Sequence, residues 1–437
     1  MAKGLGGRLL KTAAGTSGLR VANMGLLFIS NILLTRTLGK DGYGVYAYAM
    51  SWVLLLNIVA TLGSQNLVVR EVAANLTKKN WGIIRGILQW SNTIVLIFSV
   101  VVAAGLGAIA LFFQETANPQ TLITLWIALL LVPIMAITTL RQSAMRGFRH
   151  IIQGQLPENI LQPLFFMALL GSLFLFDFGE ISPPWIMALR VISGASAFLI
   201  GAILLVRIIP PEVTKSTPEY VPKQWVPSML SMLFMAGAAT IFTRSDAVML
   251  GLLRGTTEVG LYTVALRGAR FVVMSLQVGA TVLAPHVASL YAEGRIDELQ
   301  RLTTKSIRTI MAYALPVGLG LMIFGGWFLA LFGDDFVAGH PVLTVLCLGQ
   351  LVNAATGSVS LLLIMTHHER DNVVVTGTTA VLNGVLNLVL IPEWGAMGAA
   401  IATTTATIIS NIWLAVLVYR RLGIYCTIFG KPPWSKQ

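Results

Sequence analysis

Arginine is the charged residue that recurs inside the long apolar stretches of this sequence. Five arginines and no lysine lie there: Arg20, Arg190, Arg244, Arg267 and Arg270. A charge at the centre of a bilayer costs about 2.5–3.5 kcal/mol on insertion scales, so such residues usually face a protein interior or an aqueous cavity. A guanidinium stays protonated and binds phosphate oxygens through paired hydrogen bonds, whereas a buried ammonium is readily neutralised. The bias toward arginine therefore predicts a site for a phosphate-bearing ligand.

Arg267 and Arg270 form the strongest pair. They are three residues apart and so share one face of a helix. We predict that they bind a pyrophosphate in a central lumen; an interhelical ion pair, or a reach toward the outer headgroups, is the alternative. Arg20 and Arg244 are further lumen candidates, whereas Arg190 lies near a span end, from which it can extend to the surface.

Asp246 is the only acidic residue that we place deep inside a span. It follows Arg244 by two residues, which separates the two side chains by about 200° around a helix. They therefore cannot form a simple pair. We interpret Asp246 either as a counter-ion to Arg267 or Arg270, or as a residue that couples transport to a cation.

Two further features are candidates for sugar contact and for bending. Asn383 and Asn387 are four residues apart on one helical face and could bond sugar hydroxyls or a neighbouring helix. Pro316, followed by Gly318 and Gly320, interrupts an apolar stretch and is the hinge candidate.

Signals for catalysis and metal binding are missing from the sequence. The segment His367–Asp371 holds adjacent histidines without the usual spacing of metal ligands, which favours a solvated loop. We find no Gly-Lys-Ser phosphate loop, no dinucleotide fingerprint and no nucleophile elbow. The sequence therefore predicts no catalytic residue, no metal and no cofactor.

The composition identifies the elements that must position these residues. The 437 residues are 56% hydrophobic and 11% charged, whereas soluble domains carry about 25% charged residues. Since a span needs about 20 apolar residues, the length allows roughly a dozen spans and excludes a large soluble catalytic domain. We place helices at about 9–37, 43–63, 86–112, 121–140, 155–176, 184–206, 225–252, 259–284, 306–332, 341–366, 372–391 and 396–419.

Charge asymmetry predicts the orientation. Most of the 30 Lys and Arg residues fall at alternate span ends on the side of the amino terminus. The opposite ends hold only Arg36, Lys40 and Arg254. By the positive-inside rule both termini are expected in the cytoplasm.

An internal repeat predicts the domain organisation. Aligning Gly39 with Gly255 also aligns Gly44-Val45-Tyr46 with Gly260-Leu261-Tyr262, and it carries a basic loop expected at 69–79 onto 285–295. The sequence therefore predicts an all-α polytopic membrane protein with two six-helix lobes related by a parallel repeat. The expected parts are a lobe at 1–208, a cytoplasmic linker at 209–224, a lobe at 225–419 and a cytoplasmic tail at 420–437.

Three segments carry a resemblance to a known family. Leu33–Ala47 resembles the Arg-x-Leu-Gly-x-x-x-Tyr-Gly-x-Tyr turn of polysaccharide-export flippases in the multidrug/oligosaccharidyl-lipid/polysaccharide (MOP) exporter superfamily. Leu67–Ala73 is similar to the Arg-Glu-hydrophobic-Ala segment of that family, and Leu140–Gly147 to its basic, glycine-ended turn. Together with the six-plus-six layout, the resemblance covers essentially the whole chain. The position of Arg36 in the first segment makes it a further substrate-binding candidate.

The resemblance implies a function. Such flippases move an isoprenoid-pyrophosphate-linked oligosaccharide from the cytoplasmic to the outer leaflet, by alternating access between two rocking lobes, for cell-surface polysaccharide biosynthesis such as that of O-antigen. The expected location is the cell inner membrane. The expected partners are the lipid bilayer, the lipid-linked glycan and other polysaccharide-assembly proteins, without nucleic acid.

Three other functions compete with this one. A multidrug cation antiporter of the same superfamily shares the layout, but it needs an acidic cavity where this sequence predicts a basic one. A membrane-embedded polysaccharide polymerase or ligase needs a sizeable outer loop, and the outer connections predicted here are short. A non-transporting scaffold for cell-envelope enzymes would be hard to distinguish by sequence from a flippase.

Overall fold

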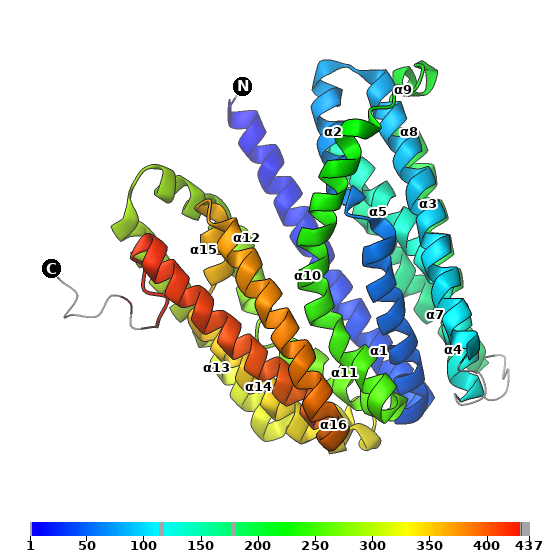
Figure 1. Cartoon of the computed structure of the whole chain (residues 1–437), viewed down its shortest axis with the longest axis vertical. Helices are drawn as coiled ribbons and strands as arrows, with labels where there is room; N and C mark the ends of the chain where they lie inside the picture. Colours follow the sequence, from blue (N-terminus) through cyan, green and yellow to red (C-terminus); the bar gives the residue numbers. More distant parts are fainter. Residues whose placement is uncertain (1, 113–117, 176–180, 429, 431–437) are drawn as a thin grey trace. The chain divides into compact units, whose positions relative to one another are not determined.

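The protein is described here by a computed structural model. It covers the backbone of residues 2–112, 118–175, 181–428 and 430 (Figure 1). Side chains of residues 2–17, 20, 174–175, 230–231, 234–244 and 281–282 lie outside the description. Throughout the described ranges the regular secondary structure is helical, which confirms the predicted all-α class.

The long helices are apolar enough to cross a bilayer. Within the described residues, eight helices meet this criterion by length and composition, or nine when one bent pair is counted as a single span. Two of them, α1 (Ala2–Thr61) and α16 (Glu369–Leu422), each merge two helices across a break. The apolar part of α1 has 41 residues, which would reach about 60 Å if straight, twice the hydrocarbon thickness. The chain is a multi-pass membrane protein, and the count of twelve spans and the repeat stay predictions.

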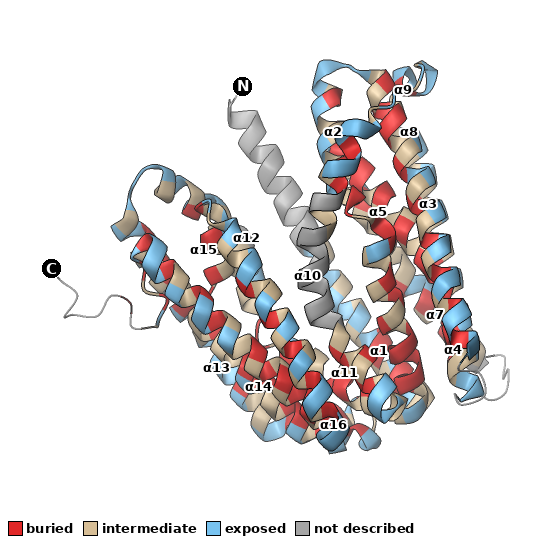
Figure 2. Cartoon of the chain, in the orientation of Figure 1, coloured by how far each residue is buried: buried red, intermediate tan, exposed pale blue. Residues whose placement is uncertain are grey.

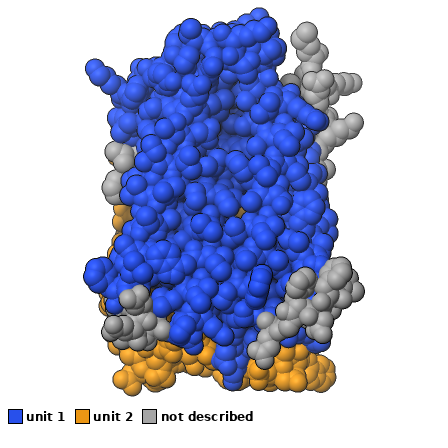
Figure 3. Space-filling view, turned by 90° about the vertical axis from the view of Figure 1, so that its right-hand side faces the viewer, with its two compact units in different colours: residues 1–240 blue, residues 241–437 orange. Residues whose placement is uncertain are grey.

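Contacts between Cα atoms divide the chain into two compact units, residues 1–240 and 241–437, which Figure 3 colours separately. The division falls inside α10 (Pro222–Arg254), not in the linker predicted at 209–224. The further elements of the first unit are α2 (Ser64–Lys78), α3 (Trp81–Phe112), α4 (Pro119–Leu129), α5 (Leu131–Gly147), α6 (Ile151–Leu156), the π-helix η1 (Pro157–Leu161), α7 (Gln162–Leu175), α8 (Pro183–Ile208) and α9 (Pro211–Lys215). The predicted domain boundaries stay predictions.

The break in α1 lies at Gly39. This residue has φ 63° and ψ −175°, a backbone conformation that side chains disfavour and glycine adopts readily. After it the second arm of α1 buries Tyr43 and Ala49 completely in the first unit. The family-like turn is therefore the corner from which this arm enters the core.

Helix α2 corrects one expectation. The segment 69–79 was predicted as a basic loop, but α2 continues through it to Lys78. Leu67, Val68 and Val72 are fully buried at spacings that fall on one side of a helix. An apolar stripe of this kind stabilises an amphipathic helix even where the other face is basic. The corresponding segment 285–295 is likewise mostly helical, because α12 (Met274–Ala292) continues through Pro285.

Helix α9 and the segment between it and α10 are attached to α3. Arg85 donates to the carbonyl oxygens of Thr214 at 2.7 Å and Ser216 at 2.5 Å. The backbone N–H of Glu219 donates to Gly82 O at 3.0 Å, and a Cβ at Gly86 would collide with the Glu219 backbone. The predicted linker is thus fixed on the first unit along part of its length.

The second unit holds the end of α10 and a further set of helices. These are α11 (Thr256–Arg270), α12, α13 (Ile296–Ala330), the 3₁₀-helix η2 (Asp334–Gly339), α14 (His340–Thr356), α15 (Val359–Met365) and α16. Helix α11 and the start of α12 are together long and apolar enough to cross a bilayer, but the chain bends by 53° at Phe271–Val273. Helix α16 breaks at Gly395, with φ 54° and ψ −129°. Buried residues recur along α14 and α16 and are drawn red in Figure 2.

Candidate functional site

The arginine pair Arg267 and Arg270 lies at the bend of the α11–α12 span. Arg270 is the last residue of α11, and the 53° bend follows it directly. Counted from the start of α11, this point lies about 22 Å along the helix. Arg267 is half-buried and Arg270 exposed. The cations also lie where the negative end of the α11 dipole stabilises them.

The packing of α11 explains why these two side chains remain accessible. The other side of the helix buries Ala265 and Ala269 completely. At Gly268 a Cβ would lie 2.8 Å from the Phe328 ring, so α13 approaches the helix closely there. The arginines occupy the remaining face and can meet a ligand.

Asp246 lies in a cluster of neutral hydrogen-bond donors, which we call the Asp246 cage: Asp246, Tyr262, Asn383, Asn387 and Thr403. The hydroxyls of Tyr262 and Thr403 donate to Asp246 Oδ2 at 2.7 and 2.6 Å. Asn387 Nδ2 donates to Asp246 Oδ1 at 2.6 Å and to Asn383 Oδ1 at 3.0 Å. Asp246 is 3% exposed, and none of the described ion pairs joins it to an arginine.

The connections between helices explain why these residues meet. Asn387 and Thr403 lie eight residues before and after the α16 break at Gly395, so they reach the same depth on its two arms. The backbone N–H of Ala396 donates to Glu258 Oε2 at 2.8 Å, which joins the α16 break to the start of α11. The two corners therefore align the side chains that lie a few turns away from them.

The cage includes two of the predicted residues. Asn383 and Asn387 are fully buried and bond within the cage, which agrees with the alternative of a bond to a neighbouring helix, and sugar contact stays a prediction. Sequence reasoning missed Tyr262 and Thr403. Tyr262 was quoted only as part of the repeat, and the equal distance of residues 387 and 403 from Gly395 was the unused signal.

The first unit holds a buried ion pair that the sequence did not predict. Arg141 Nη2 donates to both carboxylate oxygens of Glu158 at 2.6 Å and to Gly154 O at 3.3 Å. The two side chains are 2% and 13% exposed, respectively. Gln142 adds a hydrogen bond to Glu158 at 3.0 Å. Leu140–Gly147 was expected as a basic turn, but it forms the end of α5, where Arg141 faces inward.

The remaining predicted residues are distributed over both units. The side chains of Arg20 and Arg244 lie outside the described residues. Arg36 is exposed near the break of α1. The Arg190 guanidinium lies over the Phe166 ring at 5.7 Å, a cation–π contact. Helix α13 continues through Pro316 without a break, so the hinge stays a prediction.

Comparison with solved structures defines the class of fold. The chain is similar to an inward-facing multidrug resistance MATE family transporter of the MOP superfamily, with a TM-score of 0.71 at 13% identity over 92% of this chain and 94% of the other. It is also similar to the lipid II flippase MurJ in an inward closed conformation, with a TM-score of 0.70 at 13% identity over 94% and 87%. The protein therefore has the fold of a MOP superfamily membrane transporter, as the sequence predicted.

Sequence comparison identifies the family. Residues 9–291 match the family described as polysaccharide biosynthesis protein, and residues 262–431 match the lipid II flippase MurJ family. The first match spans more than half of the chain. The chain therefore belongs to the polysaccharide biosynthesis protein family.

Two curated relatives come from Haloferax volcanii. The chain is 23% identical to the probable low-salt glycan biosynthesis flippase Agl15, over 42% of this chain and 41% of the relative. It is 29% identical to the probable flippase AglR, over 38% and 36%. The aligned part thus spans less than half the length of either relative.

Proposed function

We propose that this protein is a flippase that moves an isoprenoid-pyrophosphate-linked oligosaccharide across the membrane by alternating access. The observation that carries the proposal is the accessible pair Arg267 and Arg270 at the bend of a membrane span. The family membership and the relatives named as flippases support the same activity.

The chemistry of the arginine pair fits a pyrophosphate. Two guanidinium groups one helical turn apart present paired N–H donors to adjacent phosphoryl groups. They offset the loss of water from the anion while its isoprenoid tail stays in lipid. A multidrug cation would instead meet repulsion at this bend.

The membrane potential favours outward movement of this anion. For an inside-negative potential, each negative charge that moves outward gains about 2.3 kcal/mol per 100 mV. This proposal includes the inner membrane as the location, with both termini in the cytoplasm, because the Lys and Arg residues gather on that side of the predicted spans. It also includes other polysaccharide-assembly proteins as partners.

The Asp246 cage is the proposed coupling site. Among the described residues, only neutral groups donate to its carboxylate, and none donates to the buried oxygen Asn387 Oδ1. A proton or a small cation bound there would neutralise Asp246 without an arginine. Hard cations prefer such carboxylate and amide oxygens.

The test is binding of an isoprenoid pyrophosphate, with and without a sugar, to the purified full chain. We expect the Arg267→Gln/Arg270→Gln variant to bind about 100-fold more weakly, since hydrogen bonds to charged groups contribute about 1.5–3 kcal/mol each. The matched control is Arg370→Gln/Arg420→Gln, which removes two exposed arginines of the same unit. Equal affinity in the wild type and both variants would reject the site.

A cationic dye distinguishes the competing transporter function. If the wild-type protein bound the dye and ignored the pyrophosphate lipid, the protein would act as a cation antiporter. A flippase assay in vesicles then tests transport: movement independent of the potential and of the substrate's phosphate charge would contradict the proposed driving force.

A further inference from the structure

Helix α13 is longer than a bilayer requires. Its 35 residues reach about 52 Å, whereas the hydrocarbon core is about 30 Å thick. Residues 296–309 are largely polar, and the continuous apolar part begins at Ile310. The first part of α13 therefore lies at the level of the lipid headgroups or beyond them.

One stripe of α13 changes from cationic to apolar along its length. Arg301, Lys305 and Arg308 are exposed and follow each other at spacings of four and three residues, which places them on one face. The same stripe continues with Leu315, Leu319 and Ile323, which are 45%, 43% and 66% exposed. A cationic segment followed by an exposed apolar one matches the charged headgroup and the apolar chains of an anionic phospholipid.

Residues 424–428 follow α16 and pack beside the cationic part of α13. We call this segment the wall. Gln300 bonds the backbone of Tyr425 twice, donating to its carbonyl oxygen at 3.0 Å and accepting from its N–H at 2.7 Å. Arg308 Nε donates to Ile428 O at 2.9 Å. Ile424 and Cys426 are buried in the core of the second unit. This wall is therefore built into the fold.

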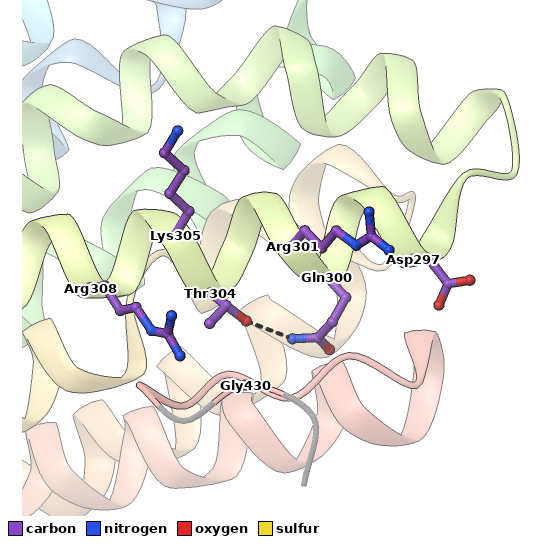
Figure 4. A pocket seen from close by; sticks show the side chains of 7 residues that line it. All are labelled: Asp297, Gln300, Arg301, Thr304, Lys305, Arg308 and Gly430. Carbon is purple, nitrogen blue, oxygen red and sulfur yellow. Dashed lines mark hydrogen bonds between the residues drawn. The ribbon is translucent and has the colours of Figure 1, made fainter. Parts of the chain in front are cut away.

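Between the wall and α13 lies a pocket of about 640 Å³, lined by α13 side chains from Asp297 to Arg308 and by Gly430. Figure 4 shows Gln300, Thr304 and Arg308 directed toward the chain at Gly430, whereas Arg301 and Lys305 extend from the side of the helix away from Gly430. The Thr304 hydroxyl accepts from Gln300 at 3.0 Å and can donate its own proton to a ligand.

The electrostatics of the pocket favour an anion. Arg301, Lys305 and Arg308 line it together with a single carboxylate, that of Asp297. The acids of the preceding turn are engaged elsewhere, since Arg295 pairs with Glu293 and Glu298. Among the described ion pairs, none includes a pocket cation.

We propose that this pocket binds the phosphate of an anionic phospholipid headgroup, with the acyl chains along the apolar stripe of α13. Basic pockets beside membrane helices bind anionic headgroups, and each nearby Lys or Arg contributes about 1 kcal/mol. A free phosphate compound would use the cations but not the stripe. The site lies within the second unit, away from Arg267 and Arg270 in sequence, and does not depend on the proposed transport.

The test is native mass spectrometry of the full chain titrated with phosphatidylglycerol or phosphatidylcholine. We expect the wild type to retain one phosphatidylglycerol preferentially and Arg301→Gln/Lys305→Gln to bind it about 30-fold more weakly. The charge-conserving variant Arg301→Lys/Lys305→Arg should keep the preference, and Arg370→Gln/Arg420→Gln should behave as wild type. This last variant removes the same charge from the same unit.

Three outcomes would overturn the proposal: equal binding of the two lipids, equal weakening by both charge-removing variants, or displacement of the bound lipid by inorganic pyrophosphate alone. The second would indicate diffuse attraction and the third a site for a soluble anion. Because the altered side chains are exposed, we expect the variants to elute from a size-exclusion column at the same volume as the wild type. The lipid-binding result does not depend on the isoprenoid pyrophosphate assay, which tests a different site.

Discussion

The two units bury a carboxylate in different ways. In the first unit Glu158 meets a cation, Arg141, which Gly201 covers so closely that a Cβ there would lie 2.3 Å from the guanidinium carbon. In the second unit the described residues that bond Asp246 are the neutral donors of its cage. The first arrangement balances its charge with a cation, whereas in the second no described cation pairs with the carboxylate.

The two arrangements suit different roles for a buried charge. A closed ion pair has its partner already and ties α5 to η1, which suits a structural role. Neutral donors hold Asp246 in place yet leave its charge able to respond to a proton or cation. Such a buried, uncompensated group in a membrane span is a natural coupling site, whereas Arg141 is a natural anchor.

The largest effect is expected from Glu158→Gln. It leaves Arg141 buried without a counter-charge and should cost about 3–5 kcal/mol of stability, seen as a lower Tm of the purified protein in detergent. The matched control is Glu71→Gln, whose exposed partner Arg70 implies a cost of about 0–1 kcal/mol. Similar Tm values for the two variants would show that burial does not distinguish these pairs.

Gly201→Ala tests the same anchor from the facing helix. The added methyl would overlap the Arg141 guanidinium, which the ion pair holds in place, so we expect a loss of about 1–3 kcal/mol. Gly171→Ala in α7 is the control, because nothing lies within 4 Å of its Cβ position. If Gly201→Ala unfolded at the same temperature as Gly171→Ala, Arg141 would have room to move.

Asp246→Asn should lower the stability less than Glu158→Gln, because no described cation would lose its partner. One carboxylate oxygen becomes an amide donor facing another donor, at a cost of about 1 kcal/mol. Transport into vesicles should nevertheless lose its cation dependence. Tyr262→Phe is the control: it removes one hydrogen bond of similar strength but keeps the charge. A Tm as low as that of Glu158→Gln would mean that Asp246 has a cationic partner.

Much of the fold was predictable because lipid imposes a simple rule on sequence. Long apolar runs must form helices whose backbone groups are satisfied internally, and Gly39 and Gly255, which the repeat aligns, both adopt a positive φ. The amphipathic helix α2 was missed because a basic face resembles a loop when only charge is counted. The burial of Leu67 and Val72 determines its structure instead.

The candidate site was predictable only in part. Spacing alone placed Arg267 and Arg270 on one face, since neighbours on a helix are fixed by its geometry. Asn387 and Thr403 belong to two arms of α16, and their meeting with Asp246 depends on how the corners at Glu258 and Ala396 join. Similarly, nothing local indicates that Arg141 faces inward, because its partner Glu158 lies on another helix.

The smallest effect is expected at the surface of the second unit, where Arg295 pairs with Glu293 at 2.7 Å. The hydrogen bond from Arg295 holds the pKa of the exposed Glu293 carboxyl below its usual range. A carboxyl group with a lowered pKa contributes stability above the pKa of the unfolded state, and this contribution is lost as pH falls through the pKa of the folded state.

Solvent and salt screen this pair, so Arg295→Ala should leave the Tm at neutral pH unchanged within error. Any difference in Tm between Arg295→Ala and the wild type should vanish at acidic pH, where Glu293 is protonated. A loss comparable to that of Glu158→Gln would instead show that exposure does not separate the ion pairs of the two units.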